Sequence, residues 1–523
     1  MSRTAPRIQT SEKWIDALLP QIRDFLAQDT VDYCIDGEMV HGYRSPDCPA
    51  LWIRDHSDIM RGARYFDADM TSAVTHFADT QLGNGSFHDF VTCNMDRENW
   101  TKHVRVPVEA DVEYRWVKAL YLAWQATGDD EWMASMLPHA ERAMAYIRQN
   151  KWRWSTEHNL VKRALTMDTW DFDYVSADQP WLNFQITDDT HWGIFHGDNS
   201  GYYEAYLCLS RLYQHLGDDR DAQRWSQDAE QLRERTNALC WNGTFYRHRV
   251  PLDDFRVEGV DETTQLSLSN PMAINRGLTS GDQAQRLIDE YIRRGEDGHV
   301  FAPWFSIDPP YPDGCFGDPL LVGGAYINGG IFPLVGGELS RAAFAHGRER
   351  FAVDCLRRYS ELIQKSGETY LWYFPDGRAS SVEESTSPEA TATDGWGSSA
   401  MLYALIEGLA GVTDADCGYR RLQLSPRWAA ADIDTANVDV GYAASGRGVA
   451  YNYAADREGC RIELEGDATV VDLHLLLPAG RRLAGVEVNG QGVEARPAVV
   501  GESNYADANL TLDGSSVITA KFA

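Results

Sequence analysis

Apolar residues recur at helical spacing through the first four-fifths of the chain. Residues 11–28 place Trp14, Leu18 and Ile22 on one face of a helix, and residues 109–126 repeat the pattern. An apolar residue at every third or fourth position indicates an amphipathic helix that packs against a core. The pattern therefore predicts a large, mainly helical region.

The predicted helices are separated by a recurring pattern in which a glycine precedes one or two charged residues. It occurs at Gly128-Asp129-Asp130, Gly217-Asp218-Asp219, Gly281-Asp282 and Gly347-Arg348. Glycine accepts the left-handed conformation that ends a helix, and aspartate caps the N-terminus of the next helix. Each site thus predicts two antiparallel helices joined by a tight turn. The intervals between the sites are too unequal for a solenoid of short repeats.

The connections between these helix pairs are long and rich in aromatic and acidic residues. They cover about 82–108, 150–199, 240–265, 296–323 and 367–394. Long loops in a compact domain usually carry function. Tight turns at one end and long loops at the other are typical of a closed ring of helical hairpins, with roughly six pairs when 11–80 and 394–412 are added. We therefore predict an (α/α)6 toroid over residues 1–417, with a cleft at the loop-rich mouth.

The hydrophobic pattern changes near residue 413 from helical spacing to strict alternation. Alternating runs occur at 448–454, 460–465, 470–477, 485–490 and 516–522. Alternation with period two predicts half-buried strands, and Asn489-Gly490 is typical of a two-residue hairpin turn. We expect a C-terminal antiparallel β-sandwich over residues 418–523 that packs on the toroid.

Composition narrows the possible partners and the compartment. The net charge of −30 disfavours nucleic acids and anionic membranes as partners. The nine cysteines are scattered without a CxxC motif, and neither an apolar leader nor a membrane-length apolar run is present. These features favour a reducing cytoplasm, and they leave the oligomeric state open. Seventeen tryptophans suit stacking on the apolar faces of sugar rings, although most buried tryptophans serve the core.

The first candidate for chemistry is the segment 167–174, MDTWDFDY. It places Asp168, Asp171 and Asp173 between three aromatic side chains. Aromatic walls desolvate a carboxyl group and raise its pKa, which a general acid near neutral pH requires. A hydrogen-bonded structural loop is the alternative, and a calcium site would lack the usual spacing.

The second candidate is a pair of adjacent carboxylates, Glu383 and Glu384, on a loop rich in Ser, Thr and Pro. Asp394, which resembles an N-cap, Trp396 and an apolar helix follow. A loop that presents acids at the start of a rigid helix suits acid–base chemistry on a polar substrate. A solvated surface loop is the alternative.

Candidate sugar-binding groups lie at the starts of predicted inner helices. Arg54 and Asp55 could grip neighbouring hydroxyls of one sugar beside Trp52, or could form an internal salt bridge. The other candidates are Glu109, Asp111, His196, Asp198 and Asn328. Each would also fit helix capping, but their shared place at the loop-rich end favours binding. His191 and His196 lack metal-ligand spacing, so we expect neither a catalytic metal nor an organic cofactor.

These motifs together resemble the six-hairpin glycosidases, most closely bacterial glycoside hydrolase family 63 and the related trehalases. Those enzymes carry their acid in a Gly-(Trp/Met)-Asp-(Phe/Asn) loop, and TWDF aligns Asp171 with it. Their base glutamate precedes a tyrosine and a proline, where this chain keeps Glu384 and Pro388 but has Thr386 for the tyrosine. That departure leaves Glu383 as the alternative base, as Asp168 is the alternative acid.

Three further segments extend the resemblance over about residues 45–412 and beyond. WIRD resembles the segment that binds the non-reducing-end sugar in the wider superfamily. YINGGIFP resembles a run of debranching-type and invertase-type toroids, and 418–523 resembles the C-terminal β domain of several such enzymes. The resemblance implies that the substrate is a small-molecule carbohydrate, with an α-glucoside as the best single choice.

We therefore expect an inverting, exo-acting glycoside hydrolase with Asp171 as general acid and Glu384 as general base. Inversion requires the two carboxyl groups to lie roughly 6.5–9.5 Å apart. The expected walls of the sugar site are Trp170, Trp304, Trp372 and Trp396. The alternatives are a phosphorylase, a sugar epimerase or isomerase that uses His196 with His56 or His248, and a glycan-binding protein without activity.

Overall fold

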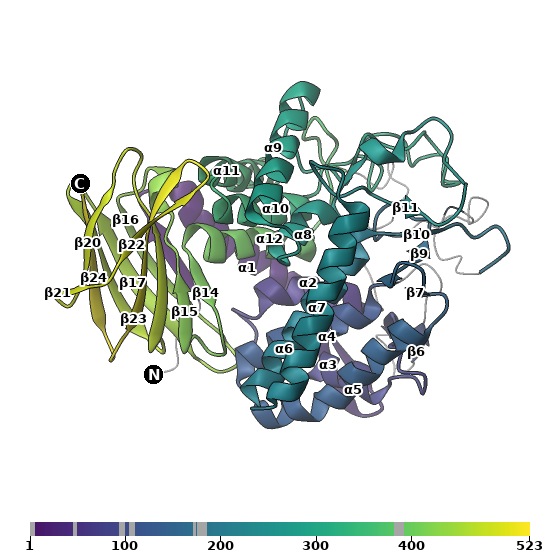
Figure 1. Ribbon diagram of the computed structural model, residues 1–523, viewed down its shortest axis with the longest axis horizontal. Coiled ribbons are helices and arrows are strands. Elements are labelled where there is room, and N and C mark those ends of the chain that lie inside the picture. Colours follow the sequence, from purple (N-terminus) through teal and green to yellow (C-terminus); the bar gives the residue numbers. More distant parts are fainter. Residues whose placement is uncertain are drawn as a thin grey trace.

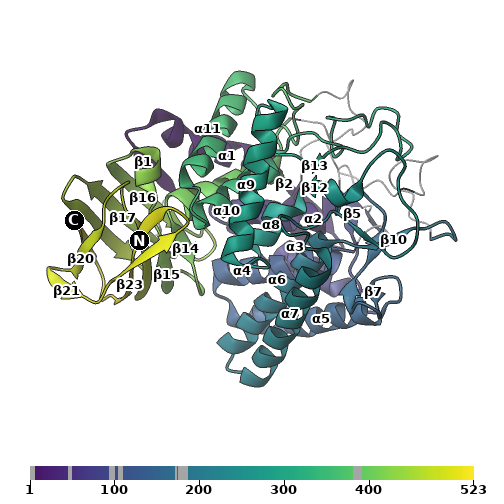
Figure 2. The ribbon, with the colours of Figure 1, turned by 45° about the horizontal axis from the view of Figure 1, so that its top comes forward.

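A computed structural model shows a helical part and a β part side by side along the longest axis of the molecule (Figures 1 and 2). The structure describes residues 6–44, 50–93, 100–103, 110–170, 174, 186–380 and 392–523. Within these ranges, none of the helices combines the length and the hydropathy needed to cross a membrane. All seven cysteines whose side chains the structure describes are free thiols.

Six helices form the inner layer of the helical part. They are α2 (Ile53–Ala63), α4 (Val112–Thr127), α6 (His196–His215), α8 (Ser269–Asn275), α10 (Pro333–Ala345) and α12 (Gly395–Tyr403), which continues as a π-helical turn over Ala404–Leu409. Each packs against the next, and α12 packs back on α2, so the contacts close into a ring. Every residue of α2 is buried, as expected for a helix that has neighbours on all sides.

Six further helices alternate with the inner ones along the chain. They are α1 (Lys13–Gln28), α3 (Ser72–Asp79), α5 (Asp130–Gln149), α7 (Asp219–Cys240), α9 (Gly281–Gly298) and α11 (Glu349–Ser366). These helices bury only a stripe. In α7 the buried residues recur every three or four positions: Ala222, Trp225, Ala229, Leu232, Thr236 and Cys240. The amphipathic pattern therefore marks the outer helices, while the inner helices are apolar or buried all round.

Three of the four predicted tight turns are confirmed. Gly128, Gly217 and Gly347 have φ values of 71°, 77° and 77°, the left-handed conformation that favours glycine. Asp129 and Asp218 then cap α5 and α7, because their side chains accept hydrogen bonds from backbone N–H groups of the first turn.

The predicted helix end at Gly281 is wrong. Gly281 is the first residue of α9, and the left-handed glycine after α8 is Gly277, with a φ of 85°. The reason is a capping box: the Ser280 hydroxyl accepts from the Gln283 backbone, and the Gln283 side chain accepts from the Ser280 backbone. A serine three residues before a glutamine is a stronger start signal than glycine is a stop signal.

The N-terminal hairpin is also not purely helical. Residues 30–43 form the strands β2 (Thr30–Ile35) and β3 (Glu38–Tyr43), paired antiparallel. The turn between them is Asp36-Gly37, and both residues have positive φ values of 53° and 86°. An Asp-Gly pair between alternating runs is a hairpin signal, and this β-hairpin lies between the helices predicted within residues 11–80.

Small sheets occupy the long connections between the helix pairs. Their strands are β4 (Ala50–Trp52), β5 (Phe90–Cys93), β6 (Trp100–His103), β7 (Trp154–Ser155), β8 (Leu160–Val161), β9 (Arg163–Ala164), β10 (Trp192–Ile194), β11 (Val250–Pro251), β12 (Leu266–Ser267) and β13 (Ile307–Asp308). In Figure 1 the long loops with β9, β10 and β11 lie on the side of the helices away from the β part.

Two packed sheets form the β part. The larger sheet has the order β1 (Arg7–Thr10), β16 (Thr435–Gly441), β17 (Gly448–Ala455), β18 (Gly459–Gly466), β24 (Ser516–Phe522), β20 (Leu483–Val488), β21 (Gln491–Val493). The smaller has the order β14 (Val412–Asp414), β15 (Arg421–Leu424), β19 (Val470–Leu476), β23 (Ser503–Thr511), β22 (Arg496–Val500). All these pairs are antiparallel except β15 and β19.

All five predicted runs of alternating residues form strands of these sheets. The turn at Asn489-Gly490 is confirmed, since both residues have positive φ values of 52° and 79°. The strand β1 at the start of the chain also belongs to the larger sheet, and β14 precedes residue 418. The boundary between 417 and 418 stays a prediction.

Candidate active site

The N-terminal ends of the inner helices gather several of the predicted polar residues. Arg54 and Asp55 lie in the first turn of α2, Asp111 is the N-cap of α4, and Asp198 lies in the first turn of α6. Asp394 caps α12, and its carboxylate accepts hydrogen bonds from the Trp396 and Gly397 backbones, as its sequence context predicted. These helix starts follow the long loops, so one end of the ring is polar.

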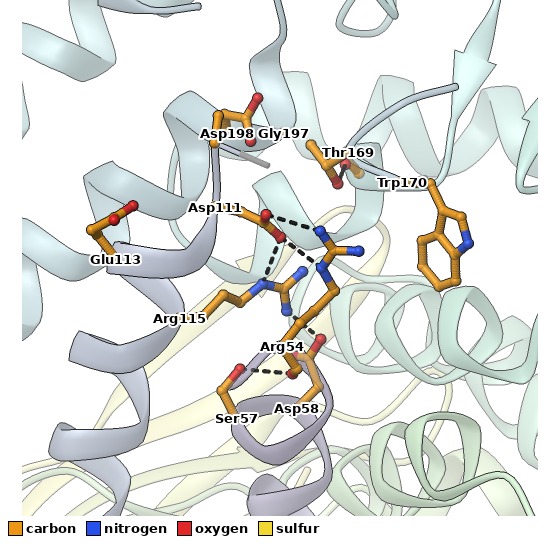
Figure 3. Close-up of polar contacts among 12 residues, drawn as sticks. Arg54, Ser57, Asp58, Asp111, Glu113, Arg115, Thr169, Trp170, Gly197 and Asp198 are labelled. Carbon is orange, nitrogen blue, oxygen red and sulfur yellow. Dashed lines mark hydrogen bonds and ion pairs between the residues drawn. The ribbon is translucent and has the colours of Figure 1, made fainter. Parts of the chain in front are cut away.

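Arg54 and Asp111 form a two-pronged ion pair across α2 and α4 (Figure 3). The guanidinium Nε and Nη2 atoms each lie 3.0 Å from one carboxylate oxygen. Asp111 also accepts from Nε of Arg115 at 3.3 Å. Both members of the pair are buried, so Arg54 makes the internal salt bridge that its sequence context also allowed. Two parallel hydrogen bonds fix its orientation as well as its charge.

Charged groups continue from this pair along the inside of the ring. Arg115 bonds to Asp58 on α2, and Arg61 on the last turn of α2 bonds to Glu338 on α10. All four side chains are buried. Buried charges persist where each has a partner of opposite sign, so these ion pairs tie α2, α4 and α10 together below the polar end.

Trp52 and Asp55 are held by neighbours near the start of α2. Asp55 bonds to Arg44, whose guanidinium lies 5.9 Å from the centre of the Trp52 ring. Phe90 stacks on Trp52 with ring centres 3.9 Å apart. The structure therefore brings the two predicted residues together in a compact group of aromatic rings and paired charges.

Trp170 and Trp396 face each other at a right angle, with ring centres 4.7 Å apart and an interplanar angle of 87°. The Trp170 indole N–H donates to the Tyr326 hydroxyl at 2.6 Å, and Phe332 packs against the Trp170 ring edge-on. The indole N–H of Trp396 is buried and has no hydrogen-bond partner in the described part of the chain. Such a donor is costly to leave unsatisfied, and a ligand hydroxyl could accept from it.

Asp168 is fully engaged in hydrogen bonds. Its carboxylate accepts from the Thr169 backbone at 2.6 Å and from both the backbone and the hydroxyl of Ser269. Burial acts to raise the pKa of Asp168, but His196, His248 and the serine hydrogen bonds bring it below the usual value. A buried, stabilised carboxylate is suited to anchoring a loop and not to donating a proton.

Two other buried carboxyl groups near Asp111 have raised pKa values. Asp198 lies 3.2 Å from Arg163, both side chains are 0% exposed, and burial raises the pKa of Asp198 to about 6. Burial raises the pKa of Glu113 to about 7. Sequence reasoning missed Glu113, although an acid in the first turn of a helix with a long apolar stretch was a visible signal. Glu113 and Asp198 lie in the first turns of α4 and α6, near Asp111 (Figure 3).

The remaining predicted residues are interior. Trp304, Trp372 and Asn328 are 0% exposed. The Asn328 amide bonds to the backbones of Tyr311 and Leu321, so it joins two loop segments. His196 is also buried; its Nδ1 bonds to the Arg247 carbonyl and its ring stacks on Tyr246. These residues form the layer behind the polar end.

The two predicted catalytic residues, Asp171 and Glu384, lie outside the described residues. So do the alternative base Glu383 and the predicted sugar ligand Glu109. What flanks them is described. The segment that leads to Asp171 ends at Trp170, whose carbonyl accepts from Arg163 Nη2 at 3.2 Å. The segment after Glu384 resumes at residue 392, where Thr393 is held by Glu368 through its N–H and its hydroxyl.

No group of three or more histidine, cysteine, aspartate or glutamate residues suited to a metal ion occurs in the described part of the chain. Among the described residues, this end of the ring offers carboxyl, guanidinium and aromatic groups. Carboxyl groups with pKa values near neutrality, fixed guanidinium groups and indole rings are the usual components of sites that bind sugars and transfer protons.

Solved structures that match this fold include rhamnosidases and a mannosylglycerate hydrolase. The α-L-rhamnosidase from Dictyoglumus thermophilum matches with a TM-score of 0.64 and 12% identity, over 99% of this chain and 50% of that chain. The Streptomyces avermitilis α-L-rhamnosidase, complexed with L-rhamnose, matches with a TM-score of 0.61 and 14% identity, over 99% and 42%. This chain thus spans about half the length of these rhamnosidases.

A shorter enzyme is covered almost completely. The family 63 mannosylglycerate hydrolase from Thermus thermophilus, in complex with glucose, matches with a TM-score of 0.51 and 14% identity, over 74% of this chain and 99% of that chain. No protein-family model matches the sequence, and no curated protein matches it either. The chain therefore shares the fold of the six-hairpin glycosidases, and the predicted resemblance is confirmed at the level of the fold.

Proposed function

We propose that this protein is an inverting, exo-acting glycoside hydrolase built on an (α/α)6 toroid. The similarity in fold to rhamnosidases and to a family 63 hydrolase supports the class of enzyme. The closed ring of contacts among the six inner helices supports the toroid. The substrate is an α-glucoside or a related small carbohydrate.

The observation that carries the proposal is the group of side chains at the N-terminal ends of the inner helices. Arg54 and Asp111 hold fixed charges there, and the Trp170 and Trp396 rings stand at right angles beside them. Indole rings stack on the apolar faces of sugars, and the buried Trp396 N–H lacks a partner in the described chain. This end of the ring therefore offers both the apolar and the polar contacts of a sugar site.

Asp171 is the general acid that protonates the leaving oxygen, and Glu384 is the general base that activates water on the opposite face of the ring. Asp171 directly follows the fixed Trp170, and Glu384 lies on the segment that ends at the N-cap of α12. Each of these carboxyl groups thus belongs to a segment that borders a residue held by hydrogen bonds at the same end of the ring. An oxocarbenium-like transition state between two such groups is the usual route to inversion.

The first experiment is a screen of aryl glycosides and disaccharides that includes glucosides, rhamnosides and mannosylglycerate. The anomer formed first is read by proton NMR. We expect hydrolysis with inversion, loss of turnover in Asp171→Asn and Glu384→Gln, and little change in Glu383→Gln. Rescue of Glu384→Gly by azide, with a glycosyl azide of inverted configuration, would place Glu384 on the face of attack, and inversion by the native enzyme would then identify it as the base and not as a nucleophile.

Several results would contradict the proposal. Turnover that depends on phosphate would indicate a phosphorylase, and interconversion without cleavage would indicate an epimerase or isomerase. Sugar binding that survives both substitutions, with no substrate turned over, would indicate a binding protein. A crystal structure with the two carboxyl groups more than ~12 Å apart would exclude their joint action on one bond and one water.

A further inference from the structure

A chain of hydrogen bonds runs behind the segment that leads to the proposed acid. It joins Glu262, Tyr311, His248 and Asp168, which come from three of the long connections between helices and are all buried. The Tyr311 hydroxyl lies 2.8 Å from Glu262 Oε1 and 3.1 Å from His248 Nδ1. The Asp168 backbone N–H donates to His248 Nε2 at 2.7 Å.

The chemistry of these groups fixes the direction of every bond. A backbone N–H only donates, so His248 Nε2 must be the unprotonated nitrogen. The neutral ring then carries its proton on Nδ1 and donates it to the Tyr311 oxygen. Tyr311 has one proton, and it points to Glu262, because a carboxylate only accepts. Both ends of the chain thus require the same tautomer of His248.

The surroundings keep His248 neutral. Burial lowers its pKa to about 3, and its ring packs edge-on against Phe195. A protonated ring would bring a second N–H against the N–H of Asp168. The donors and acceptors in this chain of hydrogen bonds therefore keep the same order wherever the protein is folded and His248 is neutral.

The far end of the chain holds an unusual backbone conformation. Asp168 has a φ of 52°, in the left-handed region that non-glycine residues rarely adopt. The Asp168 carbonyl accepts from the Thr166 hydroxyl at 2.6 Å, and its carboxylate is held by Ser269. With His248 on the N–H, every polar group of Asp168 has a partner. Two residues later the Trp170 carbonyl is fixed by Arg163.

We propose that His248 is a positioning residue whose Nδ1–H tautomer, imposed by Glu262 through Tyr311, holds the Asp168–Trp170 segment in place. This inference rests on the proposed function, because the segment sets the point from which the chain continues into Asp171. The negative charge that selects the tautomer lies three hydrogen bonds away from the loop that it controls. Glu262 and Tyr311 therefore influence the acid without contact with the substrate.

The sharpest test is Tyr311→Phe, which removes one oxygen atom and keeps the ring. Without that acceptor the His248 Nδ1–H has no partner, and the ring can turn away from the Asp168 N–H that it holds. We expect kcat to fall about ten- to hundred-fold with KM within about two-fold, because small displacements of a catalytic group reduce the rate strongly. The matched control is Tyr451→Phe in the β part. Its buried hydroxyl also bridges two partners, the Trp428 indole and the Ala410 carbonyl, and we expect unchanged kinetics.

Two substitutions of His248 separate positioning from packing. A glutamine side chain can place its amide oxygen where Nε2 lies and accept from Asp168, whereas phenylalanine cannot. We expect His248→Gln to retain at least about ten-fold more kcat than His248→Phe at a similar melting temperature. Equal losses of kcat in the two variants would overturn the proposal, because they would show that the ring acts only through its volume.

A direct readout of the tautomer keeps the inference independent of activity. In protein labelled with ¹³C,¹⁵N-histidine, the His248 signal is assigned by its absence in His248→Gln. We expect the Nδ1–H form in the native protein and, in Tyr311→Phe, a Nδ1–H signal that is shifted or weakened because the proton has lost its acceptor. If the protein cleaves no glycoside, the proposed function fails, while the Nδ1–H signal still supports the chain. The Nε2–H form in the native protein, or Tyr311→Phe kinetics equal to those of Tyr451→Phe, would overturn it.

Discussion

Replacing His56 by phenylalanine tests how strongly burial controls charge inside the ring of helices. His56 lies on α2, is 0% exposed and stacks on Tyr43 with ring centres 5.2 Å apart. Neither ring nitrogen has a hydrogen-bond partner in the described part of the chain. Burial, aided by the nearby charge of His41, lowers the pKa of His56 to about 3. Phenylalanine keeps the stacked ring and removes the titration.

The magnitude follows from the difference in pKa between the folded and unfolded states. Unfolded histidine has a pKa of about 6.5, so between pH 6.5 and 3 the unfolded chain binds a proton that the folded protein does not. Stability therefore falls as the pH falls through this window. At pH 5 the loss through His56 alone is about 2 kcal/mol relative to pH 7.5, which corresponds to a shift of about 2–4 °C in a domain of this size.

The assay is the melting temperature of the native protein and His56→Phe at pH 7.5, 6 and 5, followed by circular dichroism of the helices. We expect the native protein to lose about 2–4 °C more than the variant between pH 7.5 and 5. The charged groups that face His56, namely His41, Asp67 and Asp69, are present in both proteins. His158→Phe, on a half-buried loop residue, controls for the loss of a histidine. Parallel pH curves for the native protein and His56→Phe would refute the reasoning.

Two further predictions concern packing and buried charge. Gly337→Ala should destabilise the protein by about 3 kcal/mol or more, because its Cβ would lie 2.4 Å from the Ala400 backbone carbonyl carbon. The control is Gly281→Ala, which has open space around it and should raise the melting temperature slightly. Asp198→Asn should gain stability relative to the native protein as the pH rises from 4 to 8. The folded pKa of Asp198 is raised to about 6, so the native protein must bury an ionised carboxylate above that pH; a constant difference in melting temperature would contradict this assignment.

Sequence patterns predicted the elements whose signals are local. The Gly128 and Gly217 turns, the Asp394 cap and the Asn489-Gly490 turn were all confirmed, because each depends on one backbone conformation or one short hydrogen bond. The same kind of signal was overlooked at Asp36-Gly37, where a hairpin interrupts the first pair of helices.

The pairing of polar side chains could not be predicted in the same way. Arg54 reads equally well as a sugar ligand and as a structural cation, and only the packing of α2 on α4 shows that Asp111 lies opposite it. Glu113 and Asp198 become notable because distant helices exclude water from them, which no local pattern reports. The sequence shows which residues carry charge, but the tertiary fold determines which partner each buried charge has.

The described residues that border the two candidate catalytic segments share one structural feature. Asp168, before Asp171, and Thr393, after Glu384, are both non-glycine residues in the left-handed region, with φ values of 52° and 62°. Such conformations cost about 1–3 kcal/mol and persist only where neighbouring bonds enforce them. Here a second side chain does so in each case: Ser269 holds the Asp168 carboxylate, and Glu368 accepts from both donors of Thr393. Strain that is maintained shortly before both Trp170 and Trp396, whose rings meet edge to face, is better explained by a requirement on these segments than by stability, since stability alone would favour glycine at both positions.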